Sequence, residues 1–433
     1  MTYQETLAYL SSLDKIGIRL GLDPILRLLR RLGNPQNTYP VILVAGTNGK
    51  GSVASMIASI MATGGHKTGL YTSPHLIDLR ERIRIDGSMI SREEMTACTE
   101  QVRRQLREPV SYFEFLTAVA LLHFRRQETD VAVLEIGLGG RLDATNVVVP
   151  LVSVITNISL EHRDYLGNTL EEIAREKGGI IKPEGRCLTA ASQRSVIATL
   201  EGICRDKGAT FRRLGRDIHY RSHPDGSFSY RGIGRRHERL ACPLIGRHQV
   251  VNATLAVGAV EWIAEAGIAV DKGAVVEGLA KTRWEGRLEL LQRDPQVLVD
   301  GAHNPAGVAV LSRALKNDFA YRRLWLIFGV LSDKDYRTMA RRLFPLAHAV
   351  ILTRPVSSRS LPLESLMSAA ADIHQNVEAI EDPGAALAAA LSRAASGDLI
   401  CVTGSLYLVG EIKRIHQCPP RDENQVMKGV RPC

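Results

Sequence analysis

The chain has 433 residues, and 55 Lys and Arg against 46 Asp and Glu give it a formal net charge of +9. Hydrophobic residues make up 45% and charged residues 23%, which excludes a disordered or fibrous protein and favours two or three globular domains. No stretch approaches the roughly 18–20 apolar residues of a membrane span. The N-terminus MTYQETLAYL lacks the basic and apolar regions of a secretion signal, so we expect a cytoplasmic protein.

The spacing of the cysteines and the distribution of charge exclude further classes of protein. The seven cysteines are scattered, and no two have the CxxC spacing of a zinc ribbon, which indicates reduced thiols. The positive charge is spread along the chain and aromatic residues are only 5%, which argues against a nucleic-acid-binding surface. We therefore expect the net charge to attract small anionic substrates.

Strand-like and helix-like segments alternate along the chain. Helices are expected at 3–33, then an apolar strand at 39–46 precedes a helix at 52–65. Further segments are strand candidates at 68–76 and 82–87, helices at 91–107 and 113–127, strands at 130–137 and 151–159, a β-hairpin within 206–240, and a helix at 248–267. A second alternating pattern begins near 296. The pattern predicts an α/β fold with doubly wound, largely parallel sheets and two domains, 1–285 and 296–433, joined by a linker at 286–295.

The strongest local motif is the glycine-rich segment AGTNGKGS at 45–52, which lies between an apolar strand and a helix. Such a turn exposes backbone N–H groups to a phosphate, and the helix N-terminus and Lys50 add positive charge. The spacing differs from a standard Walker A motif, because Val44 stands at the first glycine position and Ser52 is one residue late. A nucleotide phosphate site is nevertheless the better interpretation than an ordinary strand–helix turn.

Three polar residues follow later strands of the same domain. Glu135 ends a buried strand, at the edge where open α/β sheets bind ligands, and could hold Mg²⁺ against phosphates. His162 follows the next strand and could face the same metal, although an isolated histidine is more often structural. On the sequence pattern alone, Lys177 is interpreted as a solvated lysine at the end of a helix.

In the second half of the chain, the segment VDGAHNP at 299–305 again ends a strand and begins a helix. Asp300, His303 and Asn304 are therefore placed on the ligand-binding edge of an α/β unit, and Pro305 begins the helix. A simple turn with an N-cap is the alternative interpretation.

Taken together, these motifs resemble the folylpolyglutamate synthases and dihydrofolate synthases of the Mur ligase superfamily. The matching segments follow the family's order and span almost the whole chain: VAGTNGKGSV (44–53), YTSPHL (71–76), SYFEFLT (111–117), LEIGLGGRLDATN (134–146), LEHRDYLG (160–167), EKGGIIKP (176–183), HQVVNA (248–253), WEGRLE (284–289), VDGAHNP (299–305) and TGSLYLVGE (403–411). The displaced serine of the phosphate loop is itself part of this pattern.

The resemblance implies a two-domain amide ligase of Mur ligase architecture, with an N-terminal P-loop-type ATPase domain and a C-terminal Rossmann-like glutamate-ligase domain. In such enzymes ATP, with Mg²⁺, converts a substrate carboxylate to an acyl phosphate, and L-glutamate displaces the phosphate. The implied acceptors are dihydropteroate, (tetra)hydrofolylpolyglutamate or both, and the implied oligomeric state is a monomer.

The resemblance also implies roles for individual residues. Those carried over for ATP are Thr47, Asn48, Gly49, Lys50, Gly51, Ser52, Asn252, Arg287 and Asp300. Those carried over for Mg²⁺ are Ser73, Glu135, His162 and Lys177, and Lys177 matches a lysine that is carbamylated in this superfamily. Those carried over for the pteridine and glutamate substrates are Leu20, Gly21, Ser111, Tyr112, Phe113, Glu114, Leu142, Asp143, Ala144, His303 and Ser405, with Lys50, Lys177 and His303 as catalytic candidates.

Alternatives to this interpretation stay open at this stage. A folylpolyglutamate synthase without dihydrofolate synthase activity would carry the same motifs. A ligase of muramyl precursors is disfavoured by YTSPHL and SYFEFLT, and a P-loop protein that is not a ligase would have no use for VDGAHNP or TGSLYLVGE. No motif supports nucleic-acid or membrane binding.

Overall fold

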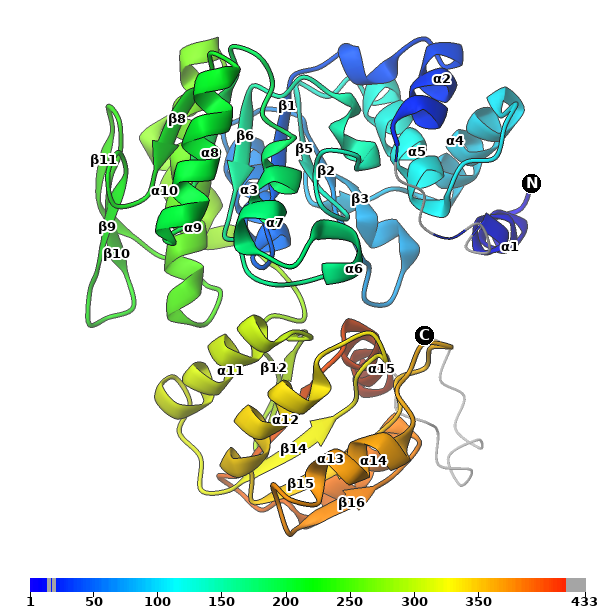
Figure 1. Cartoon of the computed structure of the whole chain (residues 1–433), viewed down its shortest axis with the longest axis vertical. Coiled ribbons are helices and arrows are strands. Elements are labelled where there is room, and N and C mark those ends of the chain that lie inside the picture. The colour runs from blue at the N-terminus through cyan, green and yellow to red at the C-terminus, as the bar shows by residue number, and fades with distance from the viewer. Residues whose placement is uncertain (14–16, 18–20, 418–433) are drawn as a thin grey trace, which may run out of the picture. The chain divides into compact units, whose positions relative to one another are not determined.

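The computed structural model describes residues 1–13, 17 and 21–417, and these form two compact units (Figure 1). The first unit comprises residues 1–75 and 79–284. The second comprises 76–78 and the described residues from 285 onward. The short segment 76–78 thus packs with residues that follow it by more than 200 positions, and no pattern in the sequence predicted this.

The first unit is built on an eight-stranded sheet with the order β4-β3-β2-β5-β1-β6-β7-β8. Its strands are β1 Val41–Ala45, β2 Thr68–Tyr71, β3 Ile83–Ile85, β4 Ser88–Met89, β5 Val131–Glu135, β6 Val152–Ile155, β7 Arg186–Thr189 and β8 Thr210–Arg213. The six strands β2, β5, β1, β6, β7 and β8 are parallel to their neighbours in this series. At one edge, β3 pairs antiparallel with β2, and β4 pairs antiparallel with β3. The predicted, largely parallel sheet is confirmed.

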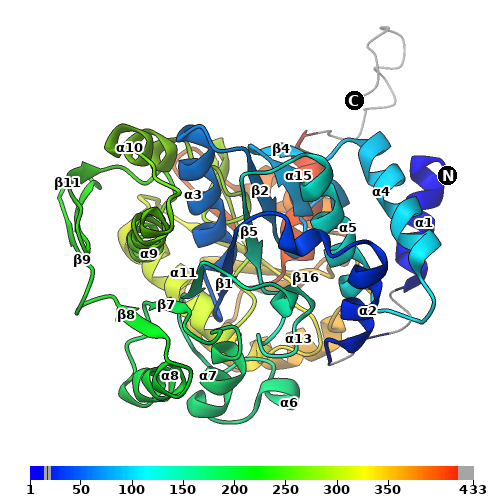
Figure 2. The same ribbon diagram turned by 90° about the horizontal axis from the view of Figure 1, so that it is seen from above.

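Helices cover both faces of this sheet (Figure 2). They are α1 Tyr3–Leu13, α2 Asp23–Arg31, α3 Lys50–Thr63, α4 Arg92–Gln105, α5 Tyr112–Arg126, α6 Arg163–Leu166, α7 Leu170–Gly178, α8 Arg194–Asp206, α9 Arg247–Ile263 and α10 Lys272–Lys281. In Figure 2, α3, α9 and α10 lie on one side of the sheet, and α4, α5, α7 and α8 lie on the other.

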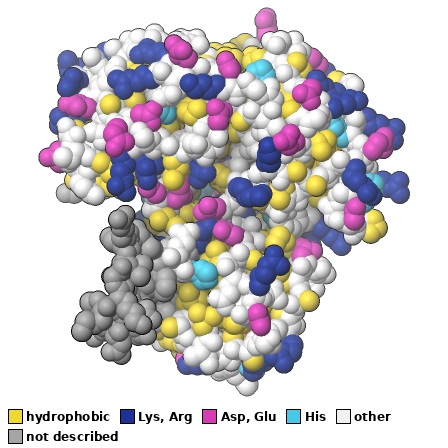
Figure 3. All heavy atoms as spheres, turned by 180° about the vertical axis from the view of Figure 1, so that it is seen from behind, with side chains coloured by type: hydrophobic (Ala, Val, Ile, Leu, Met, Phe, Trp, Pro, Cys, Tyr) yellow, Lys and Arg dark blue, Asp and Glu magenta, His cyan; other side chains and the backbone are white. Residues whose placement is uncertain are grey.

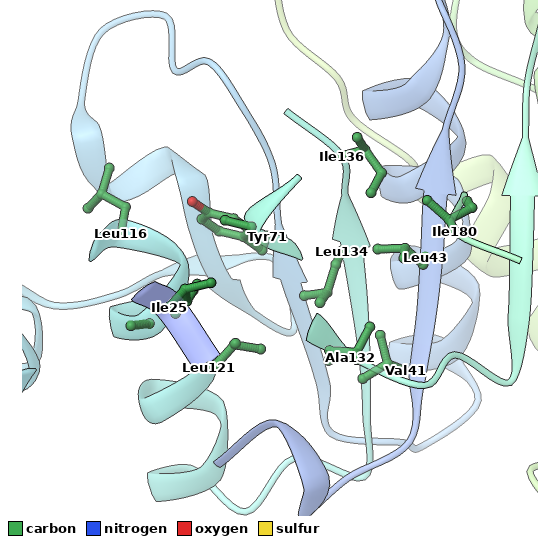
Figure 4. Packing of buried hydrophobic residues seen from close by; sticks show 14 of the residues in the cluster. Ile25, Val41, Leu43, Tyr71, Leu116, Leu121, Ala132, Leu134, Ile136 and Ile180 are labelled. Carbon is green, nitrogen blue, oxygen red and sulfur yellow. The ribbon is translucent and has the colours of Figure 1, made fainter. Parts of the chain in front are cut away.

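Alternate residues of β1 explain this layering. Val41 and Leu43 belong to the core that contains α5 and α7, whereas Ile42 and Val44 belong to the core beneath α3 and α9. Figure 4 shows Val41 beside Ala132 and Leu43 beside Leu134 of the neighbouring strand β5, in the first of these cores. Because successive side chains of a strand point to opposite faces, a strand that is buried on both faces must be apolar throughout.

The segment 206–240 departs from its predicted hairpin. It contains β8 and a separate antiparallel sheet of three strands, β9 His219–Ser222, β10 Phe228–Arg231 and β11 Arg236–Leu240. The buried side chain of Glu261 in α9 anchors this sheet by accepting hydrogen bonds from the hydroxyl of Tyr230 and from the N–H groups of Gly234 and Arg235. These long-range contacts fix a third strand that the local pattern does not indicate.

The second unit contains a six-stranded sheet with the order β12-β13-β17-β14-β15-β16, parallel except for β12. Its strands are β12 Glu289–Arg293, β13 Gln296–Asp300, β14 Leu324–Phe328, β15 Ala349–Leu352, β16 Val377–Ala379 and β17 Leu399–Thr403. Its helices are α11 Pro305–Asn317, α12 Tyr336–Leu343, α13 Leu363–Ala370, α14 Pro383–Arg393 and α15 Leu406–Gln417. The chain moves in one direction from β13 to β16 and returns to β17, so right-handed crossovers place α14 on the face opposite α11 to α13.

The surface is mixed in charge. On the face seen in Figure 3, basic and acidic side chains are interspersed rather than gathered by sign. Within the described residues, no helix is long and apolar enough to cross a membrane.

Asp398, which precedes β17, is a buried carboxylate that ties together several parts of the second unit. It accepts hydrogen bonds from the guanidinium of Arg323 at 2.7 and 3.1 Å, from the indole of Trp325 at 3.4 Å and from the N–H of Ala395 at 3.0 Å. The bond from Arg323 is the main reason that the pKa of Asp398 is lowered to about 2.

The substitution Asp398→Asn should destabilise the second unit by about 1–3 kcal/mol at neutral pH, because hydrogen bonds to a charged group are lost. The folded-state pKa lies below the unfolded value of about 3.9, so the wild-type contribution is complete above pH ~4 and is lost as the pH falls toward 2. Urea unfolding of both proteins at pH 7, 4 and 2.5 measures this. A difference between the two proteins that does not shrink at low pH would contradict the assignment.

Candidate active site

The segment 46–49 after β1 forms a tight loop that leads into α3, and two of its glycines are required by close approach. Gly46 has φ +139°, and a Cβ there would lie 1.9 Å from the hydroxyl oxygen of Thr156. Gly49 has φ +85°, and a Cβ there would lie 2.7 Å from the side-chain oxygen of Asn252. Only glycine fits this backbone, whose N–H groups at the start of α3 have no partners within the helix.

The segment that follows β6 holds this loop in place. The carbonyl of Asn157 accepts from the N–H of Thr47 at 2.8 Å, and its side-chain oxygen accepts from the N–H of Asn48 at 3.1 Å. The hydroxyl of Thr156 and the side-chain amide of Asn157 both donate to the carbonyl of Asn48, at 2.7 and 2.8 Å. Since β1 and β6 are parallel neighbours, the sheet brings these two loops to the same edge.

Two lysines meet at the carbonyl oxygen of Gly46. Lys50 donates to it at 3.1 Å and also to the carbonyl of Thr47 at 3.0 Å. Lys177, from α7, donates to the same Gly46 oxygen at 2.9 Å and pairs with the carboxylate of Glu161 at 2.7 Å. The expectation from the pattern alone, a solvated Lys177, is wrong, because the side chain is only 2% exposed.

Burial and the charges of this cluster shift the pKa values of both Glu161 and Lys177. Burial acts to raise the pKa of Glu161, but the neighbouring charges of Lys177 and Lys50 prevail and lower it to about 2. The pKa of Lys177 is lowered from its ordinary value, mainly by burial and further by the charge of Lys50, against the attraction of Glu161. Lys177 therefore loses a proton more readily than an exposed lysine.

Of the residues carried over for a metal, Ser73 and Glu135 lie together. The N–H of Ser73, just after β2, donates to the buried carboxylate of Glu135 at 3.1 Å. His162 has φ +44° and an exposed side chain at the start of α6. Within the described residues, no group of three or more His, Cys, Asp or Glu side chains is arranged to hold a metal ion.

Several of the residues carried over for the pteridine substrate make hydrogen bonds that hold the local backbone. Ser111 and Glu114 form a capping box at the start of α5, and one carboxylate oxygen of Glu114, Oε1, is buried with no hydrogen-bond partner among the described residues. Asp143 is buried and accepts from the N–H of Leu138 at 2.7 Å and from the hydroxyl of Thr145 at 2.6 Å. Burial is the main reason that its pKa is raised.

The remaining pteridine candidates are mostly apolar or partly exposed. Phe113 stacks at a tilt against Tyr71, with ring centroids 5.9 Å apart. Tyr112 is half-buried beside it, and Leu142 and Ala144 flank Asp143. Gly21 lies just before α2, and Leu20 is outside the described residues.

The helix α9 reaches the start of α3. The side-chain amide of Asn252 donates to the side-chain oxygen of Gln249 at 2.9 Å, and the amide of Gln249 lies 3.4 Å from the hydroxyl of Ser52. Asn252 also sits against Gly49, as described above. Gln249, which sequence reasoning did not select, is therefore a further candidate for this site.

In the second unit, the end of β13 gathers a separate set of candidates. The buried carboxylate of Asp300 accepts from the N–H groups of Leu288 and Ala302, both at 2.9 Å. The guanidinium of Arg287 lies against Gly301, where a Cβ would be 2.3 Å from it. The imidazole Nδ1 of His303 lies 2.8 Å from the carbonyl of Gly301.

Ser405 lies close to this set. The loop after β17 is joined to the loop after β13, because the N–H of Gly404 donates to the carbonyl of Ala302 at 3.1 Å. The hydroxyl of Ser405 accepts from the N–H of Tyr407 at 3.2 Å, at the start of α15. The structure thus brings His303 and Ser405 onto one edge of the six-stranded sheet.

A buried lysine that sequence reasoning missed holds the segment that carries Arg287. Lys413 in α15 donates to Glu285 at 2.7 Å and to both carboxylate oxygens of Glu289 at 2.6 and 2.8 Å. Glu289 in turn accepts from the N–H of Gly286 at 2.6 Å. Lys413 is 124 or more positions from these two glutamates, and only its residue type, not its spacing, could have drawn attention to it.

Glu161 and Asn157 are the other important residues that sequence reasoning did not select. Both lie within segments that were singled out, LVSVITNIS and LEHRDYLG, but their partners Lys177 and Asn48 are remote in sequence. Pairing across a parallel sheet has no local signal, so the sequence could suggest the residue types but not the contacts.

Comparison with protein families finds a match in each half of the chain. Residues 44–260 match the Mur ligase middle domain, and residues 286–406 match the glutamate ligase domain of Mur ligases. The two matches contain the phosphate loop and the Asp300 loop respectively.

Individual relatives are similar over nearly their whole length. The dihydrofolate synthase/folylpolyglutamate synthase of Bacillus subtilis is 37% identical over 427 residues, which are 95% of this chain and 98% of the relative. The structure of E. coli FolC in complex with DHPP and ADP superposes with a TM-score of 0.89 at 31% identity, covering 95% of this chain and 97% of that one. Mycobacterium tuberculosis folylpolyglutamate synthase complexed with ADP gives a TM-score of 0.90 at 33% identity, covering 97% and 100%. The chain belongs to the Mur ligase superfamily and, within it, to the dihydrofolate synthase/folylpolyglutamate synthase family of carbon–nitrogen ligases.

Proposed function

We propose that this enzyme uses ATP to join L-glutamate to a pteridine carboxylate, and that it accepts both dihydropteroate and tetrahydrofolate. The observation that carries the proposal is the loop 46–49, clamped by Asn157 and flanked by Lys50 and Lys177, in a chain similar to bifunctional synthases over 95% of its length. Relatives named folylpolyglutamate synthase also match, so the second activity is the part that needs direct measurement.

ATP is the nucleotide proposed for the phosphate loop. The start of α3 presents backbone N–H groups and the positive end of the helix dipole, which together favour a phosphate. Thr47 to Ser52 would cradle the phosphates, with Lys50 leaving its carbonyl partners to reach them. Asn252, Arg287 and Asp300 are proposed to hold the rest of the nucleotide.

Mg²⁺ is the proposed metal, and the residues present fit it. Glu135 offers a buried carboxylate and Ser73 a hydroxyl, which are the oxygen ligands that this ion prefers, and it commonly keeps water and phosphate oxygens as further ligands. Few carboxylate ligands from the protein are therefore sufficient to bind Mg²⁺. When bound, the ion would neutralise charge on the phosphates, with His162 as a further ligand.

The proposed reaction proceeds in two balanced steps. An oxygen of the acceptor carboxylate attacks the γ-phosphorus, the bond to ADP breaks, and an acyl phosphate forms. The amine of L-glutamate then attacks the acyl carbon, phosphate leaves, and the nitrogen loses a proton. Activation is needed because a free carboxylate is a poor acyl donor to an amine. His303 and Ser405 are the residues proposed to bind glutamate.

The acceptor is assigned to residues 111–114, residues 142–144 and the segment at Leu20 and Gly21, of which Leu20 lies outside the described residues. The net charge of +9 would favour acceptors with anionic glutamyl tails. We further propose that the enzyme works as a cytoplasmic monomer.

The assay that tests the function measures phosphate release with ATP, Mg²⁺ and L-glutamate, using dihydropteroate in one reaction and tetrahydrofolate in another. A product heavier by one glutamyl unit in both reactions is expected. A heavier product from tetrahydrofolate but not from dihydropteroate would restrict the activity to folylpolyglutamate synthesis. Phosphate release without glutamate and without a heavier product would contradict the ligase proposal.

Replacing Lys50 with alanine should reduce ligase activity by at least about 10²-fold, because a positive charge next to the transferring phosphoryl group is lost. Circular dichroism should show an unchanged fold, because Lys50 bonds only two backbone carbonyls of its own loop. Near-normal turnover of the folded variant would refute the assignment of the phosphate loop.

Lys177 is proposed to act after carbamylation. A neutral lysine amine adds CO2 and releases one proton, which converts a cation to an anionic carbamate, and the lowered pKa of buried Lys177 favours the neutral amine. A carbamate there would no longer pair with Glu161 and could instead serve as an oxygen ligand near the phosphates.

The substitution Lys177→Ala should therefore abolish most activity, and a small added carboxylate such as acetate should restore part of it by occupying the vacated space. Steady-state rates with and without acetate provide the measurement, and Lys182→Ala, five residues along the chain, serves as a control without rescue. Full activity of Lys177→Ala would contradict the role, and loss without any rescue would contradict the carbamate.

A further inference from the structure

Arg82 is a buried cation that the proposed reaction leaves without a role. It lies just before β3, and its side chain is 8% exposed. Its guanidinium Nε donates to the imidazole Nδ1 of His75 at 2.9 Å, and its central carbon lies 5.5 Å from the centre of the Tyr112 ring. Two neighbours thus fix the plane of the guanidinium.

Arg82 differs from the other buried cations of the chain. Lys177 pairs with one carboxylate and Lys413 with two. Within the described residues, Arg82 has no ion pair and uses only its Nε for a hydrogen bond, although a guanidinium carries five N–H donors. The terminal nitrogens of Arg82 remain accessible to solvent, so a guanidinium that is held through its Nε can receive an anion on its terminal N–H groups.

The surroundings of Arg82 indicate which anion. The carbonyl of Arg82 accepts from the N–H of Thr72 at 3.0 Å, so its backbone is paired with the residue before Ser73. Tyr71 lies on the other side of Thr72 and stacks against Phe113 of the acceptor segment 111–114. Arg82 therefore sits beside both the Ser73–Glu135 contact and the residues assigned to the acceptor.

A second observation agrees with this placement. The hydroxyl of Tyr71 accepts a hydrogen bond from Thr117 in α5, and burial raises its pKa strongly. The charges of Arg82 and Asp143 act on the same hydroxyl in opposite directions. Tyr71 thus contacts Phe113 of the segment 111–114 and Thr117 of α5, and its strand β2 pairs with β3, which follows Arg82.

We propose that Arg82 binds the acceptor carboxylate that is to be activated, with two of its terminal N–H groups donating to the carboxylate oxygens. A planar guanidinium matches a carboxylate in this way, and the contacts to His75 and Tyr112 would orient it in advance. This inference rests on the proposed function and adds a residue that recognises the reacting group of either acceptor. A carboxylate is the shared feature of dihydropteroate and tetrahydrofolate at this point.

The test compares Arg82→Gln, which removes the charge, with Arg82→Lys, which keeps it without the planar fork. Arg84→Gln is the matched control, because Arg84 lies two residues away on β3 and its Nε donates only to the backbone carbonyl of Glu81. Steady-state kinetics are measured for both acceptors and for ATP. Inhibition by 6-hydroxymethylpterin, which has a pterin ring but no carboxylate, is measured alongside.

In Arg82→Gln we expect the KM for dihydropteroate and for tetrahydrofolate to rise by about 10- to 100-fold, as loss of a charge-assisted hydrogen-bonded pair predicts. Arg82→Lys should fall between this variant and the wild type. The KM for ATP, the inhibition constant of the carboxylate-free pterin and all constants of Arg84→Gln should change by less than about twofold.

Three results would overturn the inference. An unchanged KM for both acceptors would remove any role in binding. Equal loss of affinity for the carboxylate-free pterin would mean that Arg82 only supports the shape of the site. A rise for tetrahydrofolate alone would assign the contact to a carboxylate that dihydropteroate lacks. If Arg82→Gln does not fold, Arg82→Lys decides between these results. If the wild type ligates neither acceptor, the proposed function itself fails and the inference falls with it.

Discussion

The parallel pairing of β1 with β6 brings the loops that follow these strands to one edge of the sheet, and the geometry of the candidate site depends on it. At this edge the carbonyl oxygen of Gly46 accepts hydrogen bonds from two lysines. Lys50 begins the helix after the loop, whereas Lys177 comes from α7, 131 positions away. The contact is possible only because β1 and β6 are parallel neighbours and their following loops meet at one edge. Asn157 and Thr156 also hold this loop, through hydrogen bonds to the N–H and the carbonyl of Asn48.

The same cluster concentrates positive charge where a polyanion is expected. While Lys177 is an ammonium, one carboxylate, Glu161, faces two positive charges. Once Lys177 is carbamylated as proposed, Lys50 and the N-terminal end of α3 supply the positive charge. In a buried setting this charge is little screened by solvent, and a phosphate group would gain more from it than at an exposed site. Electrostatic arrangement rather than a dedicated acid or base is the physical basis of the proposed phosphoryl transfer.

The second unit uses buried ion pairs in a different way. Lys413 and its two glutamates hold the segment that carries Arg287 against β13, and Asp398 links β17 to β14 through Arg323. The buried members of these groups, Lys413 and Asp398, are paired with oppositely charged protein side chains. Arg82 lacks such partners among the described residues, and this contrast is the reason that it was assigned to substrate rather than to structure.

The sequence by itself determined the class of fold, the order of the elements and the loops that carry chemistry. Strands buried on both faces are visible locally as continuous apolar runs, and the phosphate loop is a contiguous motif between such a strand and a helix. Because these runs and motifs are local, the sequence could place Glu135 and Asp300 at the ends of strands and Lys50 at the start of a helix.

Only the tertiary structure decided which of these residues meet. It overturned the solvated interpretation of Lys177, extended the predicted hairpin to a three-stranded sheet, and revealed Glu161, Gln249 and Lys413. Each of these depends on contacts between segments far apart in the chain. The pairing of strands and the burial of a charge are properties of the packed molecule, and no local pattern encodes them, because a lysine on a helix looks the same whether its neighbour is water or a carboxylate.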